Sequence, residues 1–224
     1  MDVRRSVNPV VSAGSTALAR LNARHPWSHN DAFIPWILRN LPAERRTAVD
    51  VGCGRGGLLT ELAREFGAVT GTDADAAMRE AATRCTAGLP NVTISAANLA
   101  DFDGPFDLIT MTAVLHHLDT PDTLVQVKRL LAPGGRFLVV GLARRESLTD
   151  HLWDYASMVT NPIIGFIRHP RRVRAAAPTP PPFPVKDPDL TFAELRALFD
   201  EYLPGSRLRW RLGFRYTAEW TRPA

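Results

Sequence analysis

Three glycines stand close together after a short apolar run. Gly52, Gly54 and Gly57 have the spacing G-x-G-x-x-G, which lets the backbone turn between a strand and a helix approach a ligand closely. Dinucleotides bind at such turns because amides at the start of the helix donate to the pyrophosphate. The spacing therefore predicts a nucleotide-like ligand and leaves a dinucleotide such as NAD open.

Two acidic residues flank this glycine turn and narrow the choice of ligand. Asp50 ends the run before the turn, where a carboxylate repels a pyrophosphate and attracts an ammonium group. Asp73 follows the next apolar run, 21 residues after Gly52. This is close to the offset at which an acidic side chain accepts the hydroxyls of a ribose. The pattern favours an adenosine compound that carries positive charge.

Polar residues after two later apolar runs complete the candidate site. Asn98 can accept from the exocyclic amine of adenine, and the backbone amide of Leu99 is placed to donate to a ring nitrogen. His116 and His117 follow a further run, and an imidazole titrates in the range needed to take a proton from a hydroxyl group. We predict that one of these histidines is a general base; the alternative is that both only support the loop.

Alternating strands and helices must position these residues. Near-continuous apolar runs predict strands at residues 47–51, 68–72, 92–95, 106–111 and 136–141. Apolar residues at helical spacing predict helices from the glycine turn to Gly67 and at residues 76–85 and 121–130, and Pro133-Gly134-Gly135 predicts a turn. Such alternation is typical of a parallel sheet covered by helices on both faces.

The two ends of the chain depart from this alternation. Residues 1–45 are predicted to form an N-terminal helical segment, and residues 46–224 the α/β domain. We interpret a segment of about residues 142–190 as an insertion, because six prolines between residues 178 and 188 preclude regular structure there. After a helical run from Phe192, two alternating runs at residues 207–212 and 214–220 predict a terminal hairpin.

The order and spacing of four sequence blocks are more specific than the glycine turn. Residues 49–57, 71–73, 106–118 and 131–135 resemble the class I S-adenosylmethionine-dependent methyltransferases, in their small-molecule branch. The resemblance implies a Rossmann-like, doubly wound sheet of seven strands, mostly parallel with an antiparallel C-terminal hairpin strand. It places S-adenosylmethionine across the carboxyl ends of the first strands.

The resemblance also implies which residues bind this cofactor. Asn98 stands where the family more commonly has aspartate, so its contact with adenine differs from the usual one. The implied contacts are Asp50, Gly52, Cys53, Gly54, Gly57, Asp73, Ala74, Asn98, Leu99, Thr112 and Ala113.

Methyl transfer is the reaction that the resemblance implies. Its barrier falls mainly through positioning and exclusion of water, and a base is needed only when the nucleophile begins protonated. The histidine pair favours O-methylation of a small-molecule hydroxyl, in secondary or in lipid- or quinone-like metabolism. His29 and Asp31 are second candidates for catalysis, because similar enzymes fold an N-terminal segment over the cofactor.

The acceptor is expected under the insertion, because loops beyond the carboxyl ends of the strands form the variable part of such sites. Residues that suit a flat or lipid-like acceptor, or an ordinary core, are Trp153, Tyr155, Met158, Ile163, Ile164 and Phe166. The apolar residues 163–167 followed by the arginines at 168–174 also suit peripheral contact with an anionic membrane, while a solvated surface is the alternative for those arginines.

The amino-acid composition argues against several classes of protein. The 224 residues are 45% hydrophobic, as expected for a globular domain, and show neither a membrane-length apolar window nor a signal peptide. We therefore expect a cytoplasmic monomer or homodimer without stable membrane insertion. The net charge is +4, but the basic residues are not interleaved with aromatic residues that could stack on bases, which argues against a nucleic-acid partner. Two cysteines predict neither a disulfide framework nor a metal site.

Two other functions stay open at this point. An NAD-dependent oxidoreductase fits the glycine spacing, although Asp50 and the terminal hairpin count against it. A non-catalytic module that binds S-adenosylmethionine fits the same sequence blocks.

Overall fold

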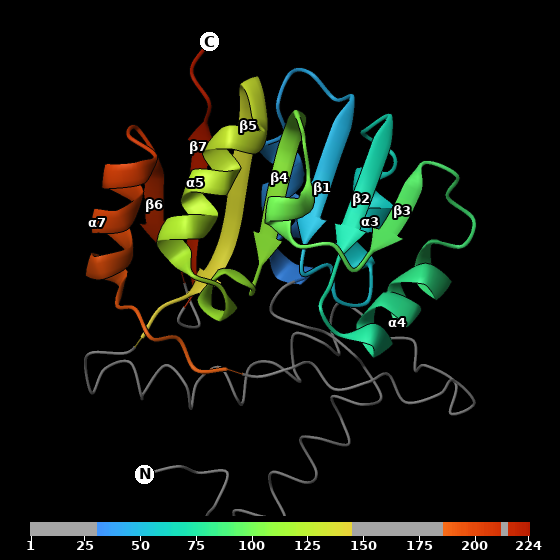
Figure 1. Cartoon of the computed structure of the whole chain (residues 1–224), viewed down its shortest axis with the longest axis horizontal. Helices are drawn as coiled ribbons and strands as arrows, with labels where there is room; N and C mark the ends of the chain where they lie inside the picture. The colour runs from blue at the N-terminus through green and yellow to red at the C-terminus, as the bar shows by residue number, and fades with distance from the viewer. Residues whose placement is uncertain (1–30, 145–185, 212–214) are drawn as a thin grey trace, which may run out of the picture. The chain divides into compact units, whose positions relative to one another are not determined.

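The structure, a computed structural model, describes residues 31–144, 186–211 and 215–224 (Figure 1). These residues belong to one compact unit. Several predictions lie outside the described residues. They are His29, the apolar residues expected to line the acceptor pocket, residues 163–167 as a membrane contact, and the arginines at 168–174.

Seven strands form one sheet, in the order β3-β2-β1-β4-β5-β7-β6. The parallel strands are β1 (Thr47–Val51), β2 (Ala68–Thr72), β3 (Val92–Ser95), β4 (Phe106–Thr112) and β5 (Leu131–Leu142). The terminal strands β6 (Arg207–Trp210) and β7 (Arg215–Thr221) are antiparallel, and β7 pairs with β5. The predicted seven-stranded, mostly parallel sheet with an antiparallel hairpin is confirmed.

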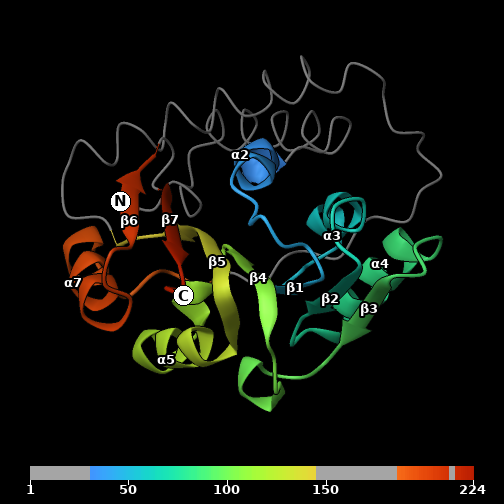
Figure 2. The same ribbon diagram turned by 90° about the horizontal axis from the view of Figure 1, so that it is seen from above.

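Helices cover both faces of this sheet, with α2 and α3 on one side and α5 and α7 on the other (Figure 2). The α-helices are α2 (Ile34–Arg39), α3 (Gly57–Leu62), α4 (Ala76–Thr86), α5 (Thr120–Leu130) and α7 (Phe192–Tyr202). Short 3-10 turns are η2 (Asp31–Phe33), η3 (Leu99–Asp101) and η4 (Leu115–His117). In the described ranges no helix has the length and apolar character needed to cross a membrane.

Side chains of the central strands alternate between two hydrophobic clusters. Leu108 of β4 and Leu138 of β5 pack with Ile37 of α2 in one cluster, whereas Ile109 and Val139 belong to the cluster that contains α5 and α7. Consecutive strand residues point to opposite faces, so a strand that is buried on both faces must be apolar throughout. This explains the continuous apolar runs in the sequence.

The structure corrects two predicted boundaries. Helix α3 ends at Leu62, and the chain continues through turns to Gly67 rather than as helix. The turn predicted at Pro133-Gly134-Gly135 lies within β5, where Leu131 pairs with Phe106 but Arg136 pairs with Leu108. Backbone bonds between Arg222 and the two glycines hold this irregular stretch in the sheet, which local sequence does not reveal.

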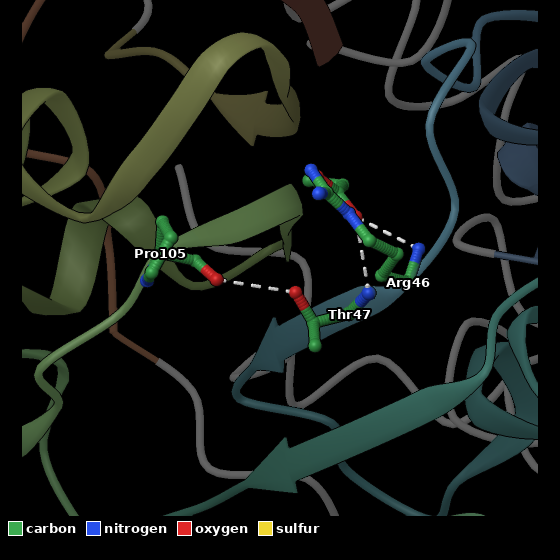
Figure 3. Close-up of polar contacts among 4 residues, drawn as sticks. Arg46, Thr47 and Pro105 are labelled. Carbon is green, nitrogen blue, oxygen red and sulfur yellow. Dashed lines mark hydrogen bonds and ion pairs between the residues drawn. The ribbon is translucent and has the colours of Figure 1, made fainter.

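A buried carboxylate ties β1 to β4 at the edge opposite the glycine turn. Asp107 is 2% exposed and accepts from the backbone amides of Arg46 at 2.7 Å and Thr47 at 3.2 Å. The Arg46 guanidinium also donates to it, while the Thr47 hydroxyl donates to the Pro105 carbonyl at 3.2 Å (Figure 3). These donors hold the pKa of Asp107 below its usual range, the Arg46 side chain first among them.

Replacing Asp107 with alanine is expected to lower the free energy of unfolding by about 2–4 kcal/mol, because two backbone donors lose their acceptor in a buried place. A carboxyl group with a lowered pKa stabilises the fold above its unfolded pKa of about 4, and this contribution is lost as the pH falls. Urea denaturation at pH 7, and at pH values below about 4, measures both effects.

Arg46→Met provides the control for this experiment. It removes the ion pair but keeps both backbone donors, and the Arg46 side chain is 68% exposed, so little change in stability is expected. Equal destabilisation by the two variants would contradict the role assigned to the backbone bonds.

Candidate active site

The carboxyl ends of β1, β2 and β4 meet at one edge of the sheet, where their arrowheads point in Figure 1. Strand order reverses between β1 and β4, because β1 is followed in sequence by β2 on one side while β4 lies on the other. In open α/β sheets, ligands bind beyond the carboxyl ends of the strands at such a reversal. The predicted site residues in the described ranges come mainly from the turns at this edge.

The glycine turn requires Gly52, Gly54 and Gly56 rather than Gly57. Gly52, Gly54 and Gly56 have φ angles of 68°, 54° and 84°, which residues other than glycine rarely adopt. A Cβ atom at Gly52 would also lie 2.1 Å from a Val114 methyl group. Gly57 has no such neighbour within 4 Å. The conformational requirement is therefore G-x-G-x-G, and Gly57 as a cofactor contact stays a prediction.

Backbone bonds fasten the glycine turn to β2. The Cys53 amide donates to the Thr72 carbonyl at 2.8 Å, and the Gly56 amide donates to the Cys53 carbonyl at 3.0 Å. The Cys53 thiol is buried, and burial raises its pKa, so it stays protonated. A Cβ at Gly71 would lie 3.1 Å from the Cys53 sulfur. The cysteine side chain thus packs the turn against the sheet.

Asp73 is oriented by the turns on either side of it. Its carboxylate accepts from the Gly54 amide and from the Asp75 amide, both at 2.9 Å. Arg79 donates to the carbonyls of Asp73 and Ala74, both at 2.8 Å. Each carboxylate oxygen can accept a further hydrogen bond, and binding of the ribose hydroxyls by Asp73 stays a prediction.

Asp50 is buried, although the sequence predicts a carboxylate that faces the ligand. It is 2% exposed and accepts a hydrogen bond from the Thr110 hydroxyl at 2.7 Å. The pKa of Asp50 is raised to about 7, chiefly by burial; the Thr110 hydrogen bond opposes this rise, and the charge of Asp73 adds to it. Asp50 therefore gains or loses its charge near neutral pH.

The turn after β3 combines an exposed and a buried residue. Asn98 is exposed, and its backbone amide donates to the Asp101 carboxylate at 2.8 Å. The Leu99 side chain is buried in the cluster that contains α5 and α7. Their contacts with adenine stay a prediction.

The chain turns sharply after β4. Ala113 has a φ angle of 58°, which is uncommon for a residue with a Cβ, and its amide donates to the Val140 carbonyl at 2.7 Å. The Thr112 hydroxyl is buried and has no hydrogen-bond partner among the described residues. An unpartnered buried hydroxyl and a strained backbone together are typical of functional sites.

The two predicted histidines differ in their surroundings. His116 is half-buried, and its Nδ1 atom has no partner within the parts of the chain that are described. Burial, followed by the charges of His117, Arg215 and Lys186, lowers the pKa of His116 to about 4. His117 is exposed, and its ring centroid lies 4.2 Å from that of His116. His116 is therefore neutral at pH 7.

A small cavity of about 40 Å³ adjoins His116. Leu142, Asp189 and Tyr216 also line it, and Asp189 forms an ion pair with Lys186 at 2.9 Å. Its volume suits a water molecule rather than a whole acceptor. Sequence reasoning missed Asp189 and Tyr216, because they lie far along the chain from the recognised sequence blocks and only the tertiary fold brings them to His116.

Comparisons with known proteins agree on one family. A family model described as a methyltransferase domain matches residues 49–137. An uncharacterized methyltransferase of Mycobacterium tuberculosis is 32% identical over 204 residues, 88% of this chain and 98% of the relative. A ubiquinone biosynthesis O-methyltransferase of Paracidovorax citrulli is 35% identical over 114 residues, 47% of this chain and 48% of the relative.

A solved structure shares the fold. Magnesium protoporphyrin IX methyltransferase from Synechocystis, with bound S-adenosylhomocysteine, is 19% identical to this chain with a TM-score of 0.53. The alignment covers 97% of this chain and 88% of that protein.

Proposed function

The chain belongs to the class I S-adenosylmethionine-dependent methyltransferases, and on this premise we propose that it methylates a hydroxyl oxygen of a small molecule. The glycine spacing alone left both NAD and S-adenosylmethionine open as ligands, and the family assignment favours S-adenosylmethionine. This cofactor carries the methyl group to be transferred on a sulfonium sulfur. The observation that carries the choice of oxygen is the neutral His116 ring after β4, whose Nδ1 atom has no partner among the described residues.

The residues at the carboxyl ends of β1 and β2 fit this cofactor. Asp73 accepts hydrogen bonds from the two ribose hydroxyls. The Gly54 and Asp75 amides, which hold its carboxylate in place, support this role. The turn from Gly52 to Gly56 lets the backbone approach the ligand. Asp50, when ionised, attracts the positive charge of the methionyl part.

His116 accepts the proton of the acceptor hydroxyl in this proposal. A base with a pKa of about 4 is weak toward a resting hydroxyl group, but it is fully unprotonated at pH 7. As the new carbon–oxygen bond forms, the oxygen gains positive charge and its proton becomes strongly acidic. A weak base therefore suffices late in the transfer, and positioning supplies most of the rate.

The relative from Paracidovorax citrulli supports oxygen as the methylated atom, because its name records O-methylation. We also propose that the N-terminal segment, residues 1–45, acts as a lid and that the insertion at about residues 142–190 binds the acceptor. Helix α2 contributes Ile37 to the core beside β1 and β4, so its packing anchors the C-terminal part of that segment to the sheet.

Isotope labelling tests the proposed reaction. A lysate of the source cells is incubated with the protein and S-adenosylmethionine that bears a deuterated methyl group, and products are followed by mass spectrometry. An O-methylated product is expected with wild-type protein. Asp73→Ala should weaken binding of the cofactor and of S-adenosylhomocysteine at least about tenfold, because two charge-assisted hydrogen bonds are lost. His116→Gln should lower kcat about a hundredfold.

The controls separate binding from catalysis. Asp103→Ala removes an exposed carboxylate and should change neither quantity, whereas His116→Gln should leave cofactor binding unchanged. Absence of cofactor binding by wild-type protein would overturn the whole proposal. A label found on nitrogen or carbon would overturn the choice of oxygen alone.

A further inference from the structure

Arg215 is a partly buried cation that forms no ion pair with the described residues. It begins β7 and pairs with Leu142 at the carboxyl end of β5. Its Nε and Nη1 atoms are buried and have no hydrogen-bond partner in the described part of the chain. Burial lowers the pKa of Arg215 to about 10.

Two arginines near this strand have polar partners, in contrast to Nε and Nη1 of Arg215. Arg136 forms an ion pair with Glu219 at 2.8 Å, and Arg211 donates to the Thr217 hydroxyl at 2.9 Å. Taking a guanidinium out of water without a partner is strongly unfavourable, and an apolar side chain would fill the same space without this penalty. Two buried guanidinium nitrogens without a partner among the described residues therefore indicate an anionic partner that these residues do not supply.

Arg215 lies near His116, the proposed base, so an anion that binds Arg215 would be part of the methyl acceptor. Its charge contributes to the lowered pKa of His116, so the two side chains lie within electrostatic reach. Thr112 pairs with Val140, and Arg215 pairs with Leu142 two residues further along β5. Alternate strand residues share a face, so the two unpartnered polar groups of Thr112 and Arg215 lie on one face of the sheet.

We propose that the methyl acceptor carries an anionic oxygen group, a carboxylate or a phosphate ester, which binds the Arg215 guanidinium. This inference rests on the proposed function and adds the charge of its substrate. The planar guanidinium presents paired donors that match both groups. An anion bound here also offsets the positive charge that lowers the pKa of His116, and so makes that imidazole a better base.

Binding of small anions to the protein loaded with S-adenosylhomocysteine tests this inference. The probes are benzoate and phenyl phosphate, with benzamide as the neutral analogue, and calorimetry measures their affinities at neutral pH. Wild-type protein is expected to bind at least one anion at least tenfold more tightly than benzamide. Arg215→Met should lose that preference, while Arg209→Met, which removes an exposed charge of the same hairpin, should keep it.

Each outcome has one meaning. Preference for benzoate assigns a carboxylate, and preference for phenyl phosphate assigns a phosphate ester. Equal anion affinity in wild type and Arg215→Met, or no anion preference in wild type, overturns the inference. Loss of S-adenosylhomocysteine binding by wild type would instead contradict the proposed function. If the methionine variant does not fold, Arg215→Gln is read in the same way.

Discussion

Replacement of Asp50 by asparagine is expected to stabilise the protein at pH 8 and at the same time to weaken S-adenosylmethionine binding. The carboxyl group is 2% exposed, and its pKa is raised to about 7, mainly by burial. An ionised carboxylate is therefore held in a place that disfavours its charge. Asparagine keeps the shape and an acceptor for the Thr110 hydroxyl but carries no charge.

The sign of the pH dependence follows from the raised pKa. Between an unfolded pKa of about 4 and a folded pKa of about 7, the folded state binds more protons, so the stability of the wild-type protein falls as the pH rises. Above pH 7 Asp50 is ionised, and the loss of folding stability caused by its buried charge is complete. We expect Asp50→Asn to be about 2–4 kcal/mol more stable at pH 8 and nearly equal to wild type at pH 4, by urea denaturation.

Cofactor binding should respond in the opposite direction. Ionised Asp50 attracts the sulfonium of S-adenosylmethionine, which S-adenosylhomocysteine lacks. The affinity of wild type for S-adenosylmethionine relative to S-adenosylhomocysteine should rise severalfold, up to about tenfold, from pH 6 to pH 8, and Asp50→Asn should remove this rise. Titration calorimetry at both pH values measures the ratio.

Thr110→Val is the matched control for Asp50. It removes the bond that favours the ionised carboxylate, so the pKa of Asp50 should rise further and the pH dependence of binding should move upward. A cofactor preference that is independent of pH in wild type would show that Asp50 does not act on the sulfonium.

Gly52→Ala is expected to destabilise the fold by about 3 kcal/mol and to abolish cofactor binding. The new methyl group would meet Val114 at 2.1 Å, in a backbone conformation with a φ angle of 68°. Both effects distort the turn between β1 and α3. Thermal unfolding and calorimetry with S-adenosylhomocysteine measure them separately.

Two further variants separate the causes. Val114→Ala combined with Gly52→Ala relieves the overlap but leaves the strained φ angle, so about half of the lost stability should return. Gly57→Ala introduces a methyl group into open space at the first position of α3 and should be neutral or stabilising by up to about 1 kcal/mol. Equal damage from Gly57→Ala and Gly52→Ala would restore the G-x-G-x-x-G interpretation.

The sequence by itself determined the order and type of the elements, because local patterns specify them. Apolar runs at residues 47–51 and 106–111 predict strands since the central sheet is buried on both faces. Glycines and acidic residues at the strand ends, together with the spacing of the sequence blocks, indicated the family and its cofactor. These signals are local or lie at a regular distance along the chain.

Tertiary structure decided the properties that depend on residues distant in sequence. Whether Asp50 is charged at pH 7 depends on its burial beside Thr110, sixty residues away. The requirement for glycine at position 52 depends on Val114, and the lack of a partner for Arg215 Nε and Nη1 among the described residues depends on where the fold places the polar groups. Burial and electrostatic interactions are set by neighbours in space, so sequence spacing predicted which residues form the candidate site but not how these residues are charged.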